Sequence, residues 1–239
     1  MNLIMKIVAI FWCCYAFLIV CGAVLCAAYS RYCKKRNIML VTKTDSPKSE
    51  NKKRGNSILS KTGDYCSGLC RYYSILIGKI PSNRIRKFLL RNIFCMKIAQ
   101  KAVVYGGFEI RYPWNIELGE CVVGVNALLD GRYGIVICDG VCLSQNVSIY
   151  TCQHDVNDQL FRINNKCGTV RINEMAWISS RTTILHSVQV GKGAVLAAGG
   201  IATKNLEPFG IYAGIPAKKI ADRNKEINYR VVDGYWHFY

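Results

Sequence analysis

The sequence predicts a mainly β protein, in which a transmembrane helix and short amphipathic helices precede a parallel β-solenoid. Apolar residues between positions 172 and 202 recur every six residues, a period that fits neither an isolated helix nor an isolated strand. A stretch of 23 residues near the start of the chain carries no charge. Basic residues concentrate between these two features. We therefore expect five regions in order: 1–30, 31–63, 64–101, 102–217 and 218–239.

Residues 1–30 are predicted to be a transmembrane anchor. The uncharged segment Ile7–Tyr29 exceeds the roughly 20 residues that a helix needs to cross a bilayer. Lys6 alone precedes it, whereas four cations follow closely: Arg31, Lys34, Lys35 and Arg36. The positive-inside rule then predicts a single-pass protein of an inner or cytoplasmic membrane, with the part of the chain that follows the span in the cytoplasm. The alternative is a cleaved signal peptide, because Cys26-Ala27-Ala28 resembles a small-residue cleavage site.

The net charge of +17 is confined to one part of the chain. Residues 31–101 hold 18 Lys and Arg against three acids, whereas residues 102–239 hold 13 against 12. A nucleic-acid partner is therefore not expected, because the solenoid is nearly neutral. A basic segment directly after a membrane span suits an anionic leaflet instead, which makes the membrane a predicted partner. Residues 31–63 are predicted to be a basic linker.

Residues 64–101 are predicted to form amphipathic helices, the second starting near Pro81 and Ser82. In that second stretch apolar residues fall at helical spacing (Ile85, Phe88, Leu89, Ile93), and we assign the basic residues to the opposite face (Arg84, Arg86, Lys87, Arg91). Two roles are open. The helices either lie on the membrane or cap the open first coil of the solenoid. We favour the cap.

Residues 102–217 are predicted to be the solenoid. One register is strict, and a second runs two places before it: Ile172, Ile178, Ile184, Val190, Leu196 and Ala202; Val170, Ala176, Thr182, Val188, Ala194 and Gly200. The register extends backward through Ile137, Leu143 and Ile149, but it is lost between Tyr150 and Thr169. We expect a loop there, and insertions in a solenoid are common places for function.

The 13 cysteines do not indicate disulfides or a metal site. They are odd in number and scattered, and no pair of C-x-x-C motifs occurs. In a reducing cytoplasm such residues act as small buried apolar groups. We predict no metal.

Two segments resemble the bacterial hexapeptide-repeat acyltransferases, in particular the sugar O-acetyltransferases of polysaccharide biosynthesis. They are "ALLDGRYGIVICDGVCLSQNVSIYTCQHD" and "AWISSRTTILHSVQVGKGAVLAAGGIATKNLEPFGIYAGIPAKKI". The similarity covers roughly residues 101–223. It implies a left-handed parallel β-helix, three six-residue strands per coil, a homotrimer, and acetyl-CoA as co-substrate.

The resemblance places the catalytic base at His154. An imidazole with a pKa near neutrality suits removal of a hydroxyl proton during acyl transfer. His154 lies in the loop that interrupts the register, whereas His186 stands where the family usually has Pro and His237 is in the tail. Asp155 is a candidate for orienting the imidazole, a role that loop backbone could equally fill. The family's direct transfer needs no serine or cysteine nucleophile.

Further site residues also follow from the resemblance. Asn126 and Asp130 align with the segment that lines the acceptor pocket, although either could simply close a turn. Contacts with coenzyme A are expected from these five residues: Ser180, Ala198, Thr203, Lys204 and Lys218. The two lysines could pair with phosphates, the alternative being ordinary solvated charges.

The sequence thus predicts an O-acetyltransferase that modifies a sugar hydroxyl of a glycan or a lipid-linked polysaccharide precursor. One alternative is a membrane-tethered scaffold whose catalytic coil has decayed, since Cys138, Ser179 and Ala197 replace family glycines. A metal-dependent anhydrase on the same solenoid needs three convergent histidines, which the coils lack. Residues 218–239 are predicted to form a short carboxyl-terminal helix, Lys218–Tyr229, and an aromatic tail.

Overall fold

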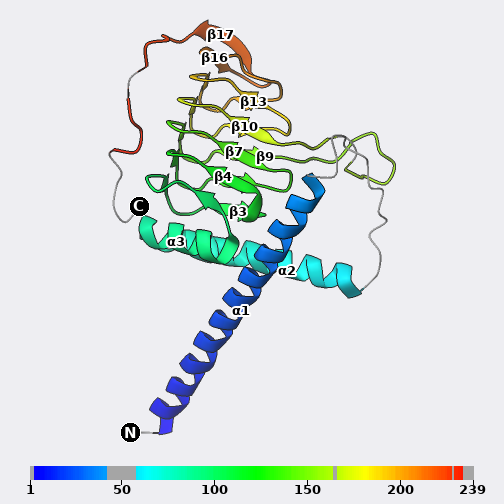
Figure 1. The fold of residues 1–239 in the computed structure, drawn as a ribbon, viewed down its shortest axis with the longest axis vertical. Helices are drawn as coiled ribbons and strands as arrows, with labels where there is room; N and C mark the ends of the chain where they lie inside the picture. The colour runs from blue at the N-terminus through cyan, green and yellow to red at the C-terminus, as the bar shows by residue number, and fades with distance from the viewer. Residues whose placement is uncertain (1–2, 42–57, 164–165, 228, 234–239) are drawn as a thin grey trace.

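The computed structural model describes residues 3–41, 58–163, 166–227 and 229–233, and shows a column of coils standing on two helices, with a third helix projecting below (Figure 1). Three parallel sheets form the column. The first contains β1 (Lys97–Ile98), β4 (Ile116–Leu118), β7 (Ile135–Ile137), β10 (Val170–Ile172) and β13 (Gln189–Val190). The second contains β2 (Val103–Val104), β5 (Val122–Val123), β8 (Cys142–Leu143), β11 (Trp177–Ile178), β14 (Val195–Leu196) and β16 (Gly210–Ala213). The third contains β3 (Glu109–Arg111), β6 (Leu128–Asp130), β9 (Ser148–Tyr150), β12 (Thr183–Ile184) and β15 (Ile201–Ala202).

The chain visits the three sheets in turn, so each coil places one strand in each. Ile172 pairs with Val190 and Ile184 with Ala202, each pair 18 positions apart, which is three repeats of six. The predicted registers fill the column's interior, because their members are almost completely buried: Ile172, Ile178, Ile184, Val190, Leu196, Ala202, Val170, Ala176, Thr182, Val188 and Ala194. The parallel β-solenoid is therefore confirmed. Its left-handedness stays a prediction.

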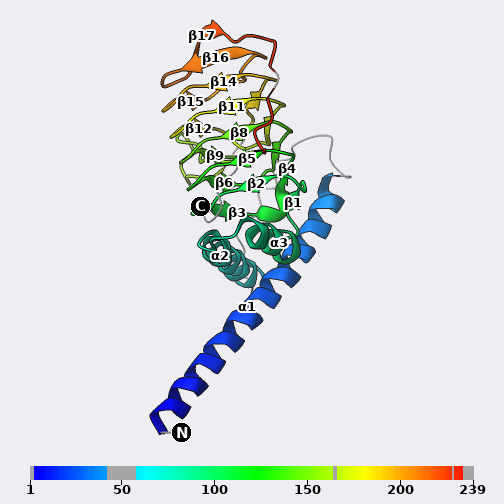
Figure 2. The same ribbon diagram turned by 90° about the vertical axis from the view of Figure 1, so that its left-hand side faces the viewer.

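Helix α1 (Leu3–Val41) is longer than the predicted anchor. One candidate membrane span occurs among the described residues, Met5–Arg36. Side chains from Met5 to Leu18 are all exposed, and packing begins at Ile19, where the Tyr73 hydroxyl donates to the Ile19 carbonyl at 2.8 Å. The helix projects away from the column (Figure 2).

The predicted linker 31–63 is wrong at both ends. Helix α1 continues to Val41 and α2 (Ile58–Gly78) begins inside the same range, while residues 42–57 lie outside the described part. The onset of charge does not end the helix, because Lys and Arg are good helix formers. Packing also holds this segment, since Lys34 Nζ donates to the Cys95 carbonyl at 2.5 Å.

Helices α2 and α3 (Asn83–Phe94) close the first coil, which supports the capping role. Ser82 is the N-cap of α3, as predicted, and its side chain accepts from the Ile85 N–H. The predicted faces of α3 hold only in part, however: Leu89 and Ile93 pack against the core and Arg84 is exposed, as expected, but four other residues are exchanged. Arg86 and Lys87 are buried, whereas Ile85 and Phe88 are exposed at 50% and 62%.

Backbone groups at the edge of the first coil, which no preceding strand among the described residues pairs, explain why Arg86 and Lys87 are buried. Asn83 Oδ1 accepts from the Val104 N–H at 3.0 Å, and Arg86 donates to the Val104 carbonyl at 2.8 and 3.0 Å. Lys87 Nζ donates to the carbonyls of Gln100 and Ala102 at 2.8 and 2.7 Å. Burial lowers the pKa of Lys87 and of Arg86. These side chains supply the partners that a preceding strand would otherwise give, so they protect the sheet edge.

The other end of the column is closed by a strand and not by the predicted helix. Strand β17 (Lys218–Asp222) runs antiparallel to β16, Ala213 pairing with Lys218. The last sheet edge needs a pairing partner, and this demand overrides the helical propensity of "AKKIADRNKE". Residues 234–239, including His237, lie outside the described residues.

Candidate active site

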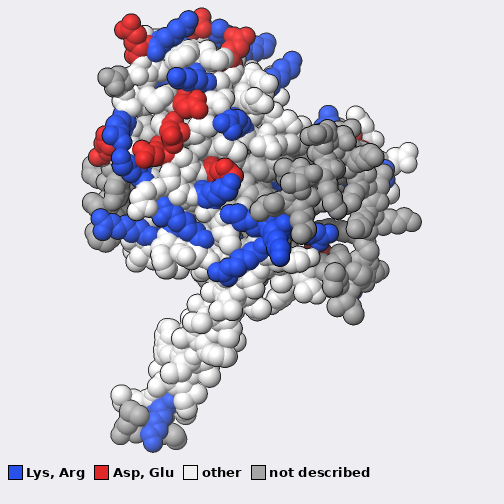
Figure 3. All heavy atoms as spheres, viewed as in Figure 1, with Lys and Arg blue, Asp and Glu red and all other residues white. Residues whose placement is uncertain are grey.

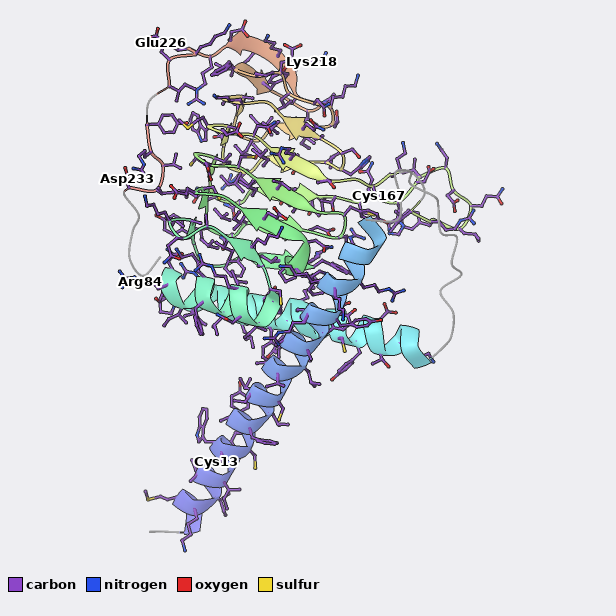
Figure 4. The ribbon with its side chains drawn as sticks, in the orientation of Figure 1. Cys13, Arg84, Cys167, Lys218, Glu226 and Asp233 are labelled. Atoms are coloured by element: carbon purple, nitrogen blue, oxygen red, sulfur yellow. The ribbon has the colours of Figure 1, made fainter. Side chains whose placement is uncertain are left out.

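The predicted loop leaves the column at the end of β9 and returns at β10. Its two arms meet at the base, where Cys152 and Cys167 form an antiparallel bridge. The Gln153 N–H donates to the Lys166 carbonyl at 2.8 Å, and the Asp155 N–H to the Arg162 carbonyl at 2.9 Å. Figure 4 shows Cys167 where the loop joins the column. The arms therefore form a hairpin that holds His154 between two backbone hydrogen bonds.

The orientation of His154 is set by Phe161. The two rings are stacked, with centroids 4.2 Å apart and planes 6° from parallel, and His154 Nδ1 lies 2.5 Å from the Phe161 carbonyl oxygen. A carbonyl can only accept, so the neutral imidazole carries its proton on Nδ1 and leaves Nε2 with a lone pair. Backbone thus fills the orienting position for which Asp155 was one candidate. Asp155 Oδ1 instead accepts from the Asn157 N–H at 3.0 Å.

The tip of the loop is organised by Asp158, which sequence reasoning missed. Its carboxylate accepts from the N–H groups of Leu160 and Arg162, at 2.8 and 3.2 Å, and pairs with the Arg162 guanidinium at 2.8 Å. Phe161 lies within this turn, so Asp158 indirectly places the partner of His154. The spacing of Asp158 and Arg162, four residues apart, signals a contact only on a helix, and this segment is a turn.

Asp130 has a different environment from the one expected of an acceptor ligand. Its side chain is fully buried, and both carboxylate oxygens accept from the Arg132 guanidinium, at 2.6 to 3.0 Å. Asp130 raises the pKa of Arg132. Arg132 also reaches the Cys152 carbonyl at 3.4 Å, and the Thr151 hydroxyl donates to the Asp130 carbonyl at 2.7 Å. This pair braces the base of the His154 loop, and Arg132 is its surface member.

Asn126 and Asp130 lie at opposite ends of β6, so the structure does not bring them together. Asn126 is in the left-handed region at φ 57°, and its N–H donates to the Gly106 carbonyl at 3.0 Å. A Cβ at Gly107 would approach Asn126 Oδ1 to 2.0 Å. Asn126 therefore closes a tight corner, as the turn interpretation allowed.

The residues expected to contact coenzyme A occupy two stacked corners and one edge. Ser180 and Ala198 lie in neighbouring coils, joined by the Gly199 N–H and the Ser180 carbonyl at 3.0 Å. Thr203 and Lys204 follow β15. Strands β9, β12 and β15 are stacked in one sheet, and the His154 loop starts just after β9, so Thr203 and Lys204 lie two coils from the base of that loop. At about 4.8 Å per coil, that separation is about 10 Å. Lys218 is exposed on β17, at the end of the column opposite α3 (Figure 4).

Other candidate groups are less suited to the chemistry. Burial raises the pKa of the Cys152 thiol to about 11, so it is protonated and non-nucleophilic at neutral pH. His186 is partly buried, and its burial, followed by the charge of Lys166, lowers its pKa. Among the described residues no group of three His, Cys, Asp or Glu side chains is placed to hold a metal ion.

A cavity of about 550 Å³ lies between α1, α2 and the first coils. Aromatic rings and two arginines line much of it: Tyr29, Tyr32, Tyr112, Trp114, Arg36 and Arg132. Trp114 stands edge-on to Tyr29 and Tyr112, at 5.7 and 5.4 Å between centroids. Arg132 connects this cavity to the base of the His154 loop.

Comparison with known proteins identifies the class to which this column and its histidine loop belong. The chain is 32% identical over 141 residues to WcaF of Escherichia coli K12, named as a colanic acid biosynthesis acetyltransferase, covering 59% of this chain and 76% of that protein. It is 29% identical over 156 residues to the galactoside O-acetyltransferase of the same strain, covering 64% and 73%. An acetyltransferase-named protein of Staphylococcus aureus MRSA252, SAR2635, matches at 30% over 125 residues, which is 50% of this chain and 61% of the relative.

A solved hexapeptide-repeat acetyltransferase of Vibrio cholerae, VCA0836 complexed with acetyl coenzyme A, shares the fold at a TM-score of 0.60 and 21% identity, over 72% of this chain and 92% of that one. No family model matches the chain. On the WcaF relationship, the chain belongs to the hexapeptide-repeat acetyltransferases, and the suspected family is confirmed.

Proposed function

We propose that the protein transfers an acetyl group from acetyl-CoA to a sugar hydroxyl, with His154 as general base. The carrying observation is the hydrogen bond from Nδ1 to the Phe161 carbonyl, which leaves Nε2 unprotonated at an exposed position. Nε2 removes the hydroxyl proton while the sugar oxygen attacks the thioester carbonyl. The tetrahedral intermediate then expels the thiolate, which takes the proton back from the imidazolium. Atoms and charges balance without a covalent acyl-enzyme.

Acetyl-CoA is proposed to lie along the corners that contain Ser180 and Ala198, with its phosphates near Lys204 and Lys218. Both lysines are exposed, so their ammonium groups are accessible to the phosphates. The neighbouring Lys219 pairs with Glu207 and Asp222, at 3.0 and 2.8 Å, and is less available. The names of WcaF, of the galactoside enzyme and of the acetyl-CoA complex support both donor and acceptor class.

The acceptor is proposed to be a glycan carried on a membrane lipid. The cavity lined by Tyr32, Arg36 and Arg132 lies on α1 immediately beyond Ser30, where the uncharged segment of that helix ends. A sugar attached to a lipid phosphate would be presented at this level, with aromatic rings and guanidinium groups as ligands. Its volume is in the range of small-molecule sites.

The membrane assignment is also a proposal. Helix α1 spans the membrane once, with Lys6 outside and the cations from Arg31 onward in the cytoplasm. The uncharged shaft between basic ends in Figure 3 supports it. A homotrimer is proposed from the family resemblance, and the exposed Trp177 on β11 is an apolar surface that a neighbouring subunit could cover.

The test is acceptor-dependent release of free thiol from acetyl-CoA by the full chain in detergent micelles. Sugars are assayed both free and attached through a phosphate to a polyprenol. Release that depends on a sugar supports the enzyme, and a lower KM for the lipid-linked form supports the acceptor class. Absence of release above the no-acceptor rate across the panel would favour the decayed scaffold instead.

A further inference from the structure

Helices α2 and α3 turn an apolar face away from the column of coils. Tyr65 and Tyr72 of α2 are exposed at 72% and 52%, and Phe88 of α3 at 62%. Tyr65 and Tyr72 are seven residues apart, and Ile85 and Phe88 three apart, so each pair shares a helix face. The opposite faces bind the column, through Arg86 on α3 and through Ser74 on α2, whose Oγ accepts from the Ile110 N–H at 3.3 Å.

The length of bare α1 is too short to cross a bilayer alone. Ile7–Leu18 lie between Lys6, which the proposed topology places outside, and the first packed residue, and 12 residues at 1.5 Å each give about 18 Å. The hydrocarbon core is about 30 Å thick. A spanning α1 therefore brings its packed segment from Ile19 onward, and with it the two helices, into the near side of the bilayer, where interfacial amphipathic helices lie.

A direct contact joins α3 to the end of the uncharged segment of α1. Arg31 is the first charge after the uncharged segment, and its guanidinium reaches the Asn92 carbonyl at 3.5 Å. Asn92 follows Phe88 by one helical turn on the outward face, since its amide donates to the Phe88 carbonyl at 2.7 Å. The end of the apolar span and the outward face of α3 thus coincide.

Charge is arranged to match a phospholipid surface. Figure 3 shows basic side chains gathered over the lower part of the body, next to the uncharged shaft, and acidic ones nearer the other end of the column. The exposed cations of this lower part come from the end of α1, the two cap helices, the turn between them and the first coil: Arg31, Lys35, Arg36, Lys61, Arg71, Lys79, Arg84, Lys97 and Lys101. Each such charge near an anionic leaflet contributes about 1 kcal/mol.

We propose that α2 and α3 form a second membrane contact, seated among the headgroups of a leaflet that contains anionic phospholipid. The proposal rests on α1 spanning the bilayer, which belongs to the proposed function. The same two helices then cap the solenoid with their inner faces and bind lipid with their aromatic outer faces. The column stands directly on the membrane, and the cavity beside Arg36 opens at the lipid surface.

Photocrosslinking of the full chain in vesicles tests this contact. The photoreactive residue p-benzoylphenylalanine replaces one side chain at a time, in vesicles of phosphatidylcholine and phosphatidylglycerol that carry a labelled phospholipid. Phe88 is the test position, with Ile85 as a second. Ile220 on β17 is the matched control, because its 65% exposure equals that of Phe88 within a few per cent. Leu18, exposed at 66%, reports the span.

We expect lipid label on the variants at Leu18, Phe88 and Ile85, and none above background at Ile220. If the Leu18 variant is labelled but the Phe88 and Ile85 variants carry no more label than the Ile220 variant, the second membrane contact is overturned and the transmembrane span is retained. Loss of label at Leu18 as well would instead overturn the proposed span. Equal labelling at Phe88 in vesicles with and without phosphatidylglycerol would contradict the role of the cations.

Discussion

Replacing Arg86 by Met should destabilise the protein strongly, although the substitution puts an apolar side chain into a buried site. Arg86 is 1% exposed. Its guanidinium makes two hydrogen bonds to the Val104 carbonyl, and it also donates to the Ile80 carbonyl. Arg86→Met leaves the Val104 carbonyl, at the edge of the first coil, and the Ile80 carbonyl, between α2 and α3, without these donors.

Two opposing terms decide the magnitude. A buried acceptor left without a partner costs about 1–3 kcal/mol, and two are created. Removing the guanidinium relieves its own burial, which is the reason its pKa is lowered. Methionine cannot donate, so the lost hydrogen bonds win, and we expect a net loss of about 2–4 kcal/mol. For a chain of this size that corresponds to a fall in Tm of roughly 5–15 °C.

The assay is thermal unfolding in detergent micelles, followed by the far-ultraviolet circular dichroism of the strands. Arg84→Met is the matched control, two residues away on the same helix but exposed, and should stay within about 0.5 kcal/mol of the parent. Equal Tm values for the two variants would refute the reasoning that α3 caps the sheet edge through its cations.

Three further predictions concern the site. Asp130→Asn should lower the free energy of unfolding by about 2–3 kcal/mol, because it breaks the buried pair with Arg132. Asp222 is exposed, so Asp222→Asn should lower it by under about 0.5 kcal/mol. Equal unfolding midpoints of the two variants in urea would contradict this. Lys204→Gln should raise KM for acetyl-CoA about threefold to tenfold, which corresponds to about 0.7–1.4 kcal/mol. Lys192→Gln, at another exposed lysine, is the control. An unchanged KM for Lys204→Gln would exclude Lys204 from the donor site. His186 has a folded-state pKa below its unfolded value near 6.5, so below that pH the unfolded chain binds more protons and stability falls with falling pH. His186→Gln should flatten this loss between about pH 6.5 and 5, measured as the difference between parent and variant unfolding curves, and parallel curves would count against it.

The solenoid could be predicted from sequence because its interior repeats one demand many times. Ile172, Ile178 and Ile184 occupy equivalent positions in successive strands, so their spacing records the geometry directly. The position of the loop followed from the failure of that spacing. The ends of the column have no repeat to reveal them, and the carboxyl-terminal strand β17 was predicted as a helix for that reason.

The partly exchanged faces of α3 show a limit of amphipathic patterns. Such a pattern assumes that charged side chains face water, but the first coil offers buried carbonyls that cations satisfy. Arg86 and Lys87 follow this second demand, and Phe88 is left outside.

The catalytic histidine of the candidate site could be predicted from sequence, but the residues that position it and its loop could not. His154 was found through the interrupted register and the family resemblance. Phe161 and Arg132 act through a backbone carbonyl and through a buried partner, and neither leaves a periodic or motif-like signal. Asp130 was found but assigned to the acceptor, whereas its carboxylate holds Arg132.

The central claim is that the imidazole of His154 removes the acceptor proton. The most direct measurement compares thiol release by His154→Ala and by His186→Ala, with the most active sugar from the acceptor panel and with circular dichroism of each variant. The account predicts that kcat falls at least about 100-fold for His154→Ala and stays near the parent for His186→Ala. A folded His154→Ala variant with the parent's kcat would contradict it.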